Sequence, residues 1–141
     1  MALGKARYLA DSSALARLHL DPVARRVGPL FLAGLVATCG IVDLELLFSA
    51  RAGADHLDIL RDRRSLPQAE AGEAQLERAV EVQTRLALQG QHREVNIPDL
   101  LIAADAEAAG LTVLHYDQHF DLVATVTGQL CEWVAPRGSL P

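Results

Sequence analysis

Residues 96–117 decide the fold of this chain, and they read NIPDLLIAADAEAAGLTVLHYD. Asn96 predicts the cap of a helix, because its side chain can accept hydrogen bonds from the free N–H groups of the first turn. The residues from Ile97 onward are too apolar for a surface helix, and Gly110 marks the end of this predicted helix. Residues 111–117 then form the short apolar run typical of a strand inside a parallel sheet. Two carboxylates flank this core, Asp99 at the start of the helix and Asp117 at the end of the strand.

The rest of the chain alternates short strands with helices in the same way. Further strands are expected at residues 7–10, 35–38 and 130–134. Helices are expected at residues 12–20, from 21 to either 28 or 33, 41–51, 54–64, 70–89 and after 117. This order predicts a parallel sheet covered by helices on both faces, with right-handed crossovers. In such a sheet the ligand crevice lies at the carboxyl ends of the strands.

Length and composition fit a single domain over residues 1–141. The tail from 135 to 141 contains prolines, a glycine and a serine, and is expected to fray. The start of the chain has no apolar signal core, and no apolar run reaches about 18 residues, so we expect a cytoplasmic protein without membrane contact. Cys39 and Cys131 have no metal-ligand spacing and are expected to be thiols in a reducing compartment.

The formal net charge of −5 excludes a surface that attracts nucleic acid as a whole, so RNA contact requires a local basic patch. The densest basic run is Arg61, Arg63 and Arg64, whose phosphate contacts would position RNA without specifying its sequence. The interleaved Asp58 and Asp62 leave a second interpretation open, a solvated helix face with internal salt bridges. Aromatic residues make up only 4% of the chain, which favours recognition of RNA shape and unpaired loops over base stacking.

Three acids lie where a crevice is expected, but each also has a structural explanation. Asp11 and Asp117 directly follow predicted strands, and an Asp in that place often caps the next helix. With Asn96 as the cap, Asp99 takes the third helical position and resembles part of a capping box. These three residues therefore do not establish chemistry by themselves.

Glu45 lies in a helix that is apolar nearly all round, and it has no local partner. The side chains three and four positions away on the same helix are Ile41, Val42, Phe48 and Ser49. An isolated buried carboxylate costs several kcal/mol, so Glu45 is expected to be paired or bound to a metal. Two alternatives stay open, an edge position that reaches water and an arginine from elsewhere in the fold.

If Asp11, Glu45, Asp99 and Asp117 converge in one crevice, their mutual repulsion raises some pKa values unless a cation compensates. A hard divalent ion with oxygen ligands is the natural solution. Mg²⁺ typically binds through one or two carboxylates and keeps water and substrate phosphate as its other ligands. Such an ion activates water and stabilises the leaving oxygen of a phosphodiester.

Four segments in this order resemble the PIN-domain ribonucleases, and specifically the VapC toxins of toxin–antitoxin pairs. They are Asp11-Ser12-Ser13-Ala14-Leu15, Leu44-Glu45-Leu46, Pro98-Asp99-Leu100-Leu101-Ile102-Ala103-Ala104 and Leu114-His115-Tyr116-Asp117-Gln118-His119-Phe120-Asp121. The resemblance spans nearly the whole chain. It implies a three-layer α/β sandwich, in which helices flank a short, mostly parallel sheet of about four or five strands.

The resemblance also implies an activity, that of a metal-dependent endoribonuclease acting as the toxin. The residues that match the family's catalytic acids are Asp11, Glu45, Asp99 and Asp117. Of these, Asp11, Asp99 and Asp117 would bind one Mg²⁺ or Mn²⁺ ion, and Ser13 matches a hydroxyl position that supports a ligand or water. The expected partners are an RNA substrate, a cognate antitoxin that occludes the acidic groove, and further copies in a homodimer or a toxin–antitoxin hetero-oligomer.

His119 departs from the family pattern. Many relatives carry a second Asp two residues after the last acid, and this chain has His119 there. The departure favours a single well-formed metal site, with His119 either hydrogen-bonding the substrate or lying on the surface. His115 belongs to the expected strand, so the two histidines do not form the helical pair of a zinc site.

Two other functions are compatible with acids at strand ends. In a non-catalytic binding module, the same acids would cap helices and form an acidic groove for a basic partner peptide. A phosphoacceptor receiver domain also places Asp at strand ends, but it needs a lysine after a late strand, and the single lysine of this chain is Lys5. Binding of Mg²⁺ or Mn²⁺ separates the binding module from the ribonuclease.

Overall fold

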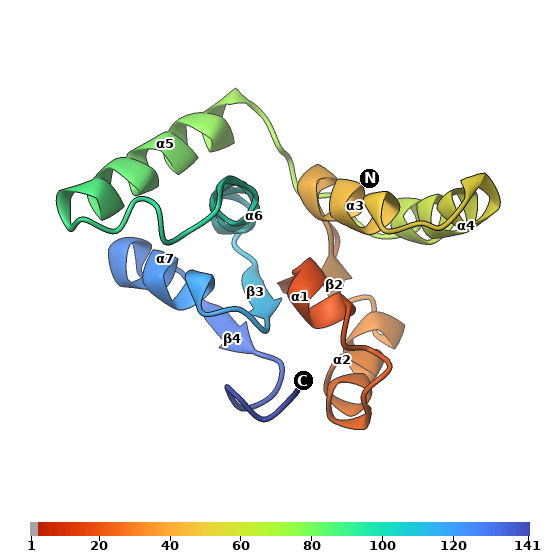
Figure 1. Ribbon diagram of the computed structural model, residues 1–141. Coiled ribbons are helices and arrows are strands. Elements are labelled where there is room, and N and C mark those ends of the chain that lie inside the picture. Colours follow the sequence, from red (N-terminus) through yellow and green to blue (C-terminus); the bar gives the residue numbers. More distant parts are fainter. Residues whose placement is uncertain (1–2) are drawn as a thin grey trace.

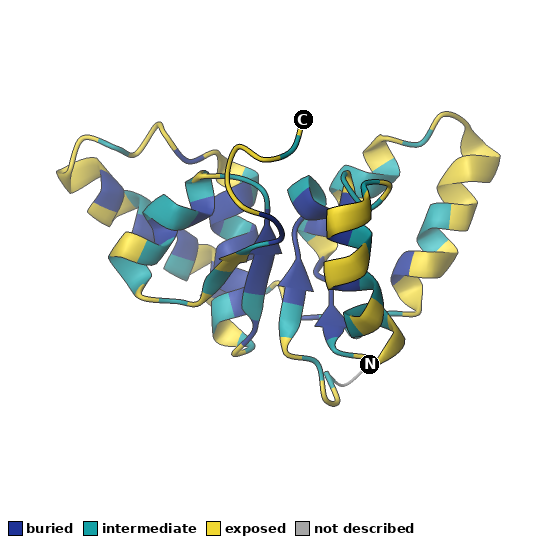
Figure 2. Cartoon of the chain, turned by 90° about the horizontal axis from the view of Figure 1, so that it is seen from below, coloured by how far each residue is buried: buried dark blue, intermediate teal, exposed yellow. Residues whose placement is uncertain are grey.

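The centre of the molecule is a parallel sheet. The computed structural model describes residues 3–141. Within these residues the strands are β1 (Tyr8–Ala10), β2 (Val36–Ala37), β3 (Thr112–His115) and β4 (Cys131–Trp133). They pair in the order β2-β1-β3-β4, and every neighbouring pair is parallel. The carboxyl ends of the strands therefore lie at one edge of the sheet, as the arrows in Figure 2 show.

Helices connect the strands and lie on both sides of the sheet (Figure 1). They are α1 (Ser12–Leu15), α2 (Asp21–Leu32), α3 (Gly40–Phe48), α4 (Gly53–Arg64), α5 (Glu73–Leu88), α6 (Ile97–Ala108) and α7 (His119–Thr127). α5 packs against α6 and α7, whereas α3 packs against α4 and α1. This arrangement confirms the predicted α/β sandwich with a parallel sheet. Among the residues that the structure describes, no helix is both long and apolar enough to cross a membrane.

The stretch that decides the fold forms the middle of the core. The side chain of Asn96 caps α6 as predicted, accepting a hydrogen bond from the backbone N–H of Asp99 at 2.9 Å. Gly110 follows α6 with a φ of 71°, a left-handed conformation that turns the chain into β3. β3 lies between β1 and β4, and its residues from Val113 to His115 are fully buried. Figure 2 shows this burial along the central strands.

Some helices end at other residues than the sequence predicts. The helix expected at 12–20 stops at Leu15, because the backbone carbonyl of Ser13 accepts a hydrogen bond from the Arg17 guanidinium at 2.7 Å and the chain continues as turns. The helix expected at 41–51 ends at Phe48. The next helix, expected from residue 54, begins at Gly53.

The tail after β4, expected to fray, makes contacts beside the end of β3. The Tyr116 hydroxyl accepts a hydrogen bond from the backbone N–H of Leu140 at 2.8 Å. The Arg17 guanidinium lies over the Tyr116 ring and donates to the carbonyl of Pro141 at 3.0 Å. These contacts place the end of the chain next to the carboxyl edge of the sheet.

Candidate active site

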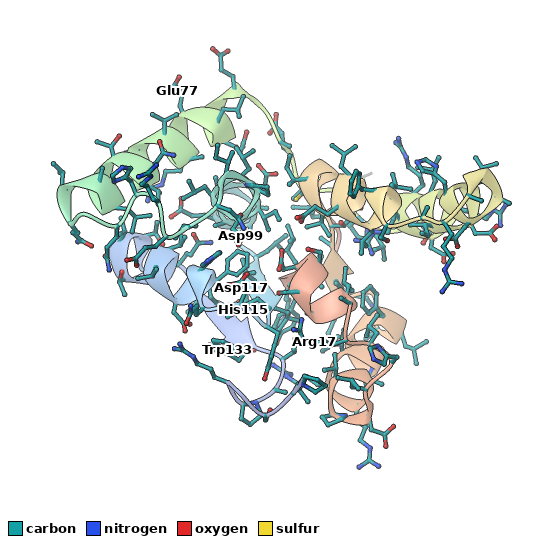
Figure 3. The ribbon with its side chains drawn as sticks, viewed as in Figure 1. Arg17, Glu77, Asp99, His115, Asp117 and Trp133 are labelled. Carbon is teal, nitrogen blue, oxygen red and sulfur yellow. The ribbon has the colours of Figure 1, made fainter. Side chains whose placement is uncertain are left out.

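A cleft of about 910 Å³ opens at the carboxyl edge of the sheet. Its polar lining includes every acid predicted for the site together with two hydroxyls, namely Asp11, Ser12, Ser13, Glu45, Asp99 and Asp117. These residues come from the segment after β1, from α3, from the first turn of α6 and from the loop after β3. Figure 3 shows Asp99 and Asp117 close together where α6, α7 and α1 meet.

Asp11 is the most deeply buried acid of the cleft, with only 2% of its surface exposed. It caps α1, because its Oδ2 accepts hydrogen bonds from the backbone N–H of Ser13 at 3.0 Å and from the Ser13 hydroxyl at 2.5 Å. Its other oxygen, Oδ1, has no hydrogen-bond partner among residues 3–141. Burial raises the pKa of Asp11, while the hydrogen bonds from Ser13 lower it. The predicted cap is present, but it satisfies one carboxylate oxygen and leaves the second for a ligand.

Ser13 holds the ends of two strands together. Its hydroxyl donates to Asp11 and accepts a hydrogen bond from the backbone N–H of Tyr116 at 2.9 Å. The backbone N–H of Asp11 also donates to the carbonyl of Leu114 at 2.8 Å. Ser13 therefore fixes the position of Asp11 relative to the loop that carries Asp117.

Asp99, Asp117 and His119 form the tightest group in the site. Nδ1 of His119 lies 2.9 Å from Oδ2 of Asp99 and 3.5 Å from Oδ1 of Asp117. One donor atom from each residue lies within 4.8 Å of the other two. The pKa of Asp99 is raised to about 7, mainly by burial and also by the charges of Asp11 and Asp117, while the hydrogen bond with His119 opposes the shift. Three side chains, from α6, the loop after β3 and the start of α7, thus converge with a spacing that could hold a divalent metal ion.

The loop after β3 brings Asp117 into this group, and His115 holds the loop in place. The imidazole of His115 is fully buried, with the rings of Phe120 and Trp133 each 5.0 Å from it between centroids. Its Nδ1 accepts a hydrogen bond from the backbone N–H of Asp117 at 3.2 Å. Burial lowers the pKa of His115 to about 4, which keeps the ring neutral and able to accept this bond. His115 is a structural residue, as its place in a strand predicts.

Glu45 reaches the rim of the cleft from α3. The Ser12 hydroxyl donates to its Oε1 at 3.1 Å, and the side chain is half-buried. Burial raises the pKa of Glu45, the hydrogen bond from Ser12 lowers it, and the charge of Asp11 raises it. The partner of Glu45 is therefore a hydroxyl rather than an arginine. Ser12 was not among the predicted site residues, although the two adjacent hydroxyls after Asp11 were an available signal.

One side of α3 packs against the core, and apolar residues on its other side form a wall of the same cleft. Val42 is the buried residue of this helix. Leu44 and Phe48 line the cleft while 64% and 94% of their surfaces are exposed. An apolar surface thus adjoins the acidic floor.

The basic run on α4 is not the continuous patch that the sequence suggested. Arg63 is only 7% exposed, and its Nε donates to Oδ1 of Asp43 at 2.9 Å while its Nη2 donates to the Thr38 hydroxyl at 2.6 Å. The exposed Arg61 pairs with Asp58 on the same helix. The alternative of internal salt bridges describes this helix better, and Arg63 is unavailable to RNA phosphates.

Comparison with known proteins identifies the family. Residues 8–126 match the family model of the PIN domain. The chain is 46% identical over 134 residues to Ribonuclease VapC21 of Mycobacterium tuberculosis, which covers 94% of this chain and 97% of the relative. The chain belongs to the PIN-domain VapC family. The resemblance carried by the four acidic segments is therefore confirmed.

Solved structures share the VapC fold. The DNA-bound VapBC of Salmonella typhimurium matches with a TM-score of 0.73 and 16% identity, covering 92% of this chain and 99% of that chain. VapBC-5 of Mycobacterium tuberculosis, a member of the VapBC family of toxin–antitoxin systems, matches with a TM-score of 0.60 and 23% identity, covering 91% and 97%. At these identities the likeness concerns the fold.

His119, which the sequence analysis marked as a departure from the family resemblance, lies within the acidic cleft. The structure places His119 against two acids of the cleft rather than on the open surface. Its backbone N–H also donates to Oδ1 of Asp117 at 3.0 Å, which fixes the start of α7. The imidazole of His119 is therefore part of the same cluster as the carboxylates of Asp99 and Asp117.

Proposed function

We propose that this VapC-family chain is a metal-dependent endoribonuclease that acts as the toxin of a toxin–antitoxin pair. One observation carries the proposal: all the predicted acids line one cleft, and a buried oxygen of Asp11 in that cleft lacks a partner among the described residues. The name of the relative Ribonuclease VapC21 supports the same activity. The substrate is RNA, and the reaction is hydrolysis of its phosphodiester bonds.

The donor set fits a hard divalent cation. Mg²⁺ and Mn²⁺ prefer carboxylate oxygens as ligands, and we assign Asp11, Asp99 and Asp117 to one such ion. Burial raises the pKa values of Asp11 and Asp99, and the charges of neighbouring acids add to this, a cost that a cation between them would offset. When bound, such an ion supplies an activated water and neutralises charge on the phosphodiester.

The other polar residues of the cleft orient these groups and exchange protons. Glu45 is assigned to accept a proton from the attacking water, because its half-buried carboxylate lines the cleft together with the three aspartates. Ser12 orients the Glu45 carboxylate through their hydrogen bond. The hydroxyl of Ser13 is occupied on both sides by protein groups, so we assign Ser13 to holding Asp11 in place rather than to binding substrate.

We assign the apolar wall beside the acids, formed by Leu44 and Phe48, to binding of the antitoxin. Leu44 and Phe48 expose large apolar surfaces on α3, at the side of the cleft that holds Glu45. A partner segment with apolar side chains along this wall and a basic side chain toward the acids would occlude the site. The antitoxin would thus inhibit by covering the catalytic residues.

A second apolar surface suits a homodimer or a hetero-oligomer. A groove of about 270 Å³ lies between α5 and α6. The exposed residues Leu76, Val80 and Ile97 line it. We assign this groove to self-association, and light scattering of the purified protein with and without Val80→Glu tests that assignment. A lower mass for the variant is expected, whereas equal masses would exclude the groove as the contact.

Incubation of the purified protein with total RNA tests the activity. We expect cleavage with Mg²⁺ or Mn²⁺, its loss with EDTA, and its return when excess metal is added. Glu45→Gln should lose most of the activity, whereas Glu77→Gln on α5 should keep it, since Glu77 points away from the cleft in Figure 3. Tight binding of a basic peptide without any cleavage by the wild type would instead favour the non-catalytic acidic-groove module.

A further inference from the structure

We infer that His119 is itself a ligand of the metal ion and gives the site a preference for Mn²⁺ over Mg²⁺. This inference rests on the proposed function, because it concerns the ion that the acidic cluster would hold. It changes the assignment of His119 from a substrate contact to a nitrogen donor.

The geometry supports coordination by nitrogen. Two neighbouring ligands of an octahedral ion with bonds of about 2.1 Å lie roughly 3 Å apart. Nδ1 of His119 lies 2.9 Å from Oδ2 of Asp99 and 3.5 Å from Oδ1 of Asp117, which is close to that spacing. The backbone N–H of His119 is bonded to Asp117, so the imidazole is held beside both carboxylates.

Asp11 provides an independent sign that a ligand binds here. It is 2% exposed, and its Oδ1 has no hydrogen-bond partner within residues 3–141. Asp11 lines the same cleft as Asp99 and Asp117. A buried carboxylate oxygen without a partner is unusual in proteins, and a cation in the cleft would satisfy it.

The chemistry of the donors sets the metal preference. Mg²⁺ binds oxygen ligands and loses its water reluctantly, so an imidazole in place of a carboxylate weakens its site. First-row transition ions accept imidazole nitrogen together with carboxylate oxygen. A site in which His119 supplies one donor therefore favours Mn²⁺ over Mg²⁺. A neutral imidazole also adds no negative charge, which disfavours an ion held by charge alone more than one that bonds the nitrogen.

A different arrangement would give the same distances without coordination. A protonated His119 could remain paired with Asp99 beside the ion and donate nothing to it. Pulsed electron paramagnetic resonance of bound Mn²⁺ distinguishes the two, because a directly bound imidazole nitrogen couples to the electron spin. Titration calorimetry with Mg²⁺ and with Mn²⁺ gives the preference separately.

The variants are His119→Asp, which restores an acid, and His119→Gln, which removes the imidazole without adding charge. His56→Asp is the matched control, since His56 is exposed on α4. We expect nitrogen coupling in the wild type and in His56→Asp, and none in the two His119 variants. The ratio of the Mg²⁺ to the Mn²⁺ dissociation constant should fall by about tenfold in His119→Asp.

Two results overturn the inference in different ways. Mn²⁺ that binds the wild type without nitrogen coupling, or a ratio of dissociation constants unchanged in His119→Asp, would exclude His119 as a ligand and leave the ribonuclease intact. Failure of the folded wild type to bind either ion at millimolar concentration would contradict the proposed function as well.

Discussion

The hydroxyl oxygen of Ser13 lies 2.5 Å from Oδ2 of Asp11 and fixes the most buried acid of the cleft. The same hydroxyl accepts a hydrogen bond from Tyr116, one residue before Asp117. A single hydroxyl thus sets the distance between the carboxylates that follow β1 and β3. In a site that must hold a cation between carboxylates, this distance governs activity.

Ser13→Ala should therefore lower both stability and RNA cleavage. The change leaves the Tyr116 N–H without its partner, which costs about 1–3 kcal/mol of unfolding free energy. Ser12→Ala is the matched comparison, because Ser12 contacts only the half-buried Glu45 through its side chain. Urea unfolding and cleavage rates measure both variants. Equal stability losses in the two would show that the bridge between the strand ends is not important.

Arg63→Ala and Arg64→Ala should differ sharply although they are neighbours. Arg63 is buried against Asp43, so its removal leaves that nearly buried carboxylate with hydrogen bonds from Thr38 and Gln68 but without its charge partner, and should cost about 3–5 kcal/mol. Arg64 is exposed, and its loss should change stability by less than about 0.5 kcal/mol. Thermal unfolding of both proteins gives the comparison. Similar melting temperatures would contradict a structural role for Arg63.

The sequence predicted the layout of the site because the acids follow strand ends. Asp11 and Asp117 meet at one edge of a parallel sheet, a consequence of topology alone, and the cap of Asn96 placed Asp99 in the first turn of α6. The order of strands and helices could likewise be predicted from the apolar runs and from the glycines and prolines between them. These features depend on local sequence or on the direction of the chain.

Burial in three dimensions was harder to predict. The apolar pattern around Glu45 predicts a buried helix, yet α3 buries only part of its apolar surface and exposes Leu44 and Phe48. Arg63 was read as part of a basic patch, because its partner Asp43 lies twenty positions away. The position of His119 depends on side-chain packing between α6 and α7, which no spacing rule reveals.

Asp105 should make stability fall with rising pH. Its carboxyl on α6 is 2% exposed, and Oδ2 has no hydrogen-bond partner in the part of the chain that the structure describes. Burial raises the pKa of Asp105 from 3.8 to about 6, against a hydrogen bond with Cys39 that lowers it. The native state therefore binds more protons than the unfolded state between these values, and the stabilisation present below pH 3.8 is lost as the pH rises through about 6.

Asp105→Asn removes this dependence. Relative to the wild type, the variant should gain roughly 2–3 kcal/mol of unfolding free energy between pH 4 and pH 7.5. Denaturant unfolding at a series of pH values measures the difference, with Asp62→Asn as the exposed control. A difference that stays flat with pH would show that Asp105 titrates normally.

Phe48→Ser should leave the fold intact and weaken antitoxin binding. Because 94% of Phe48 is exposed, the change should alter the unfolding free energy by less than about 0.5 kcal/mol. The fully buried Phe120 is the contrast, since Phe120→Ala should cost about 3–5 kcal/mol. Co-purification with the product of an adjacent antitoxin gene measures binding. Undiminished binding by Phe48→Ser would exclude the α3 wall as the docking surface.

Cleavage of RNA by Asp99→Asn tests the central claim most directly. Asp99 is 5% exposed, contacts His119 and lines the cleft with Asp11 and Asp117. The amide keeps the shape of the carboxyl and its position in the first turn of α6, and it removes a buried charge, so the variant should remain folded. Asp62→Asn on the exposed face of α4 is the matched control. We predict that Asp99→Asn remains folded and loses metal-dependent cleavage while Asp62→Asn retains it; cleavage by Asp99→Asn at the wild-type rate would contradict the account.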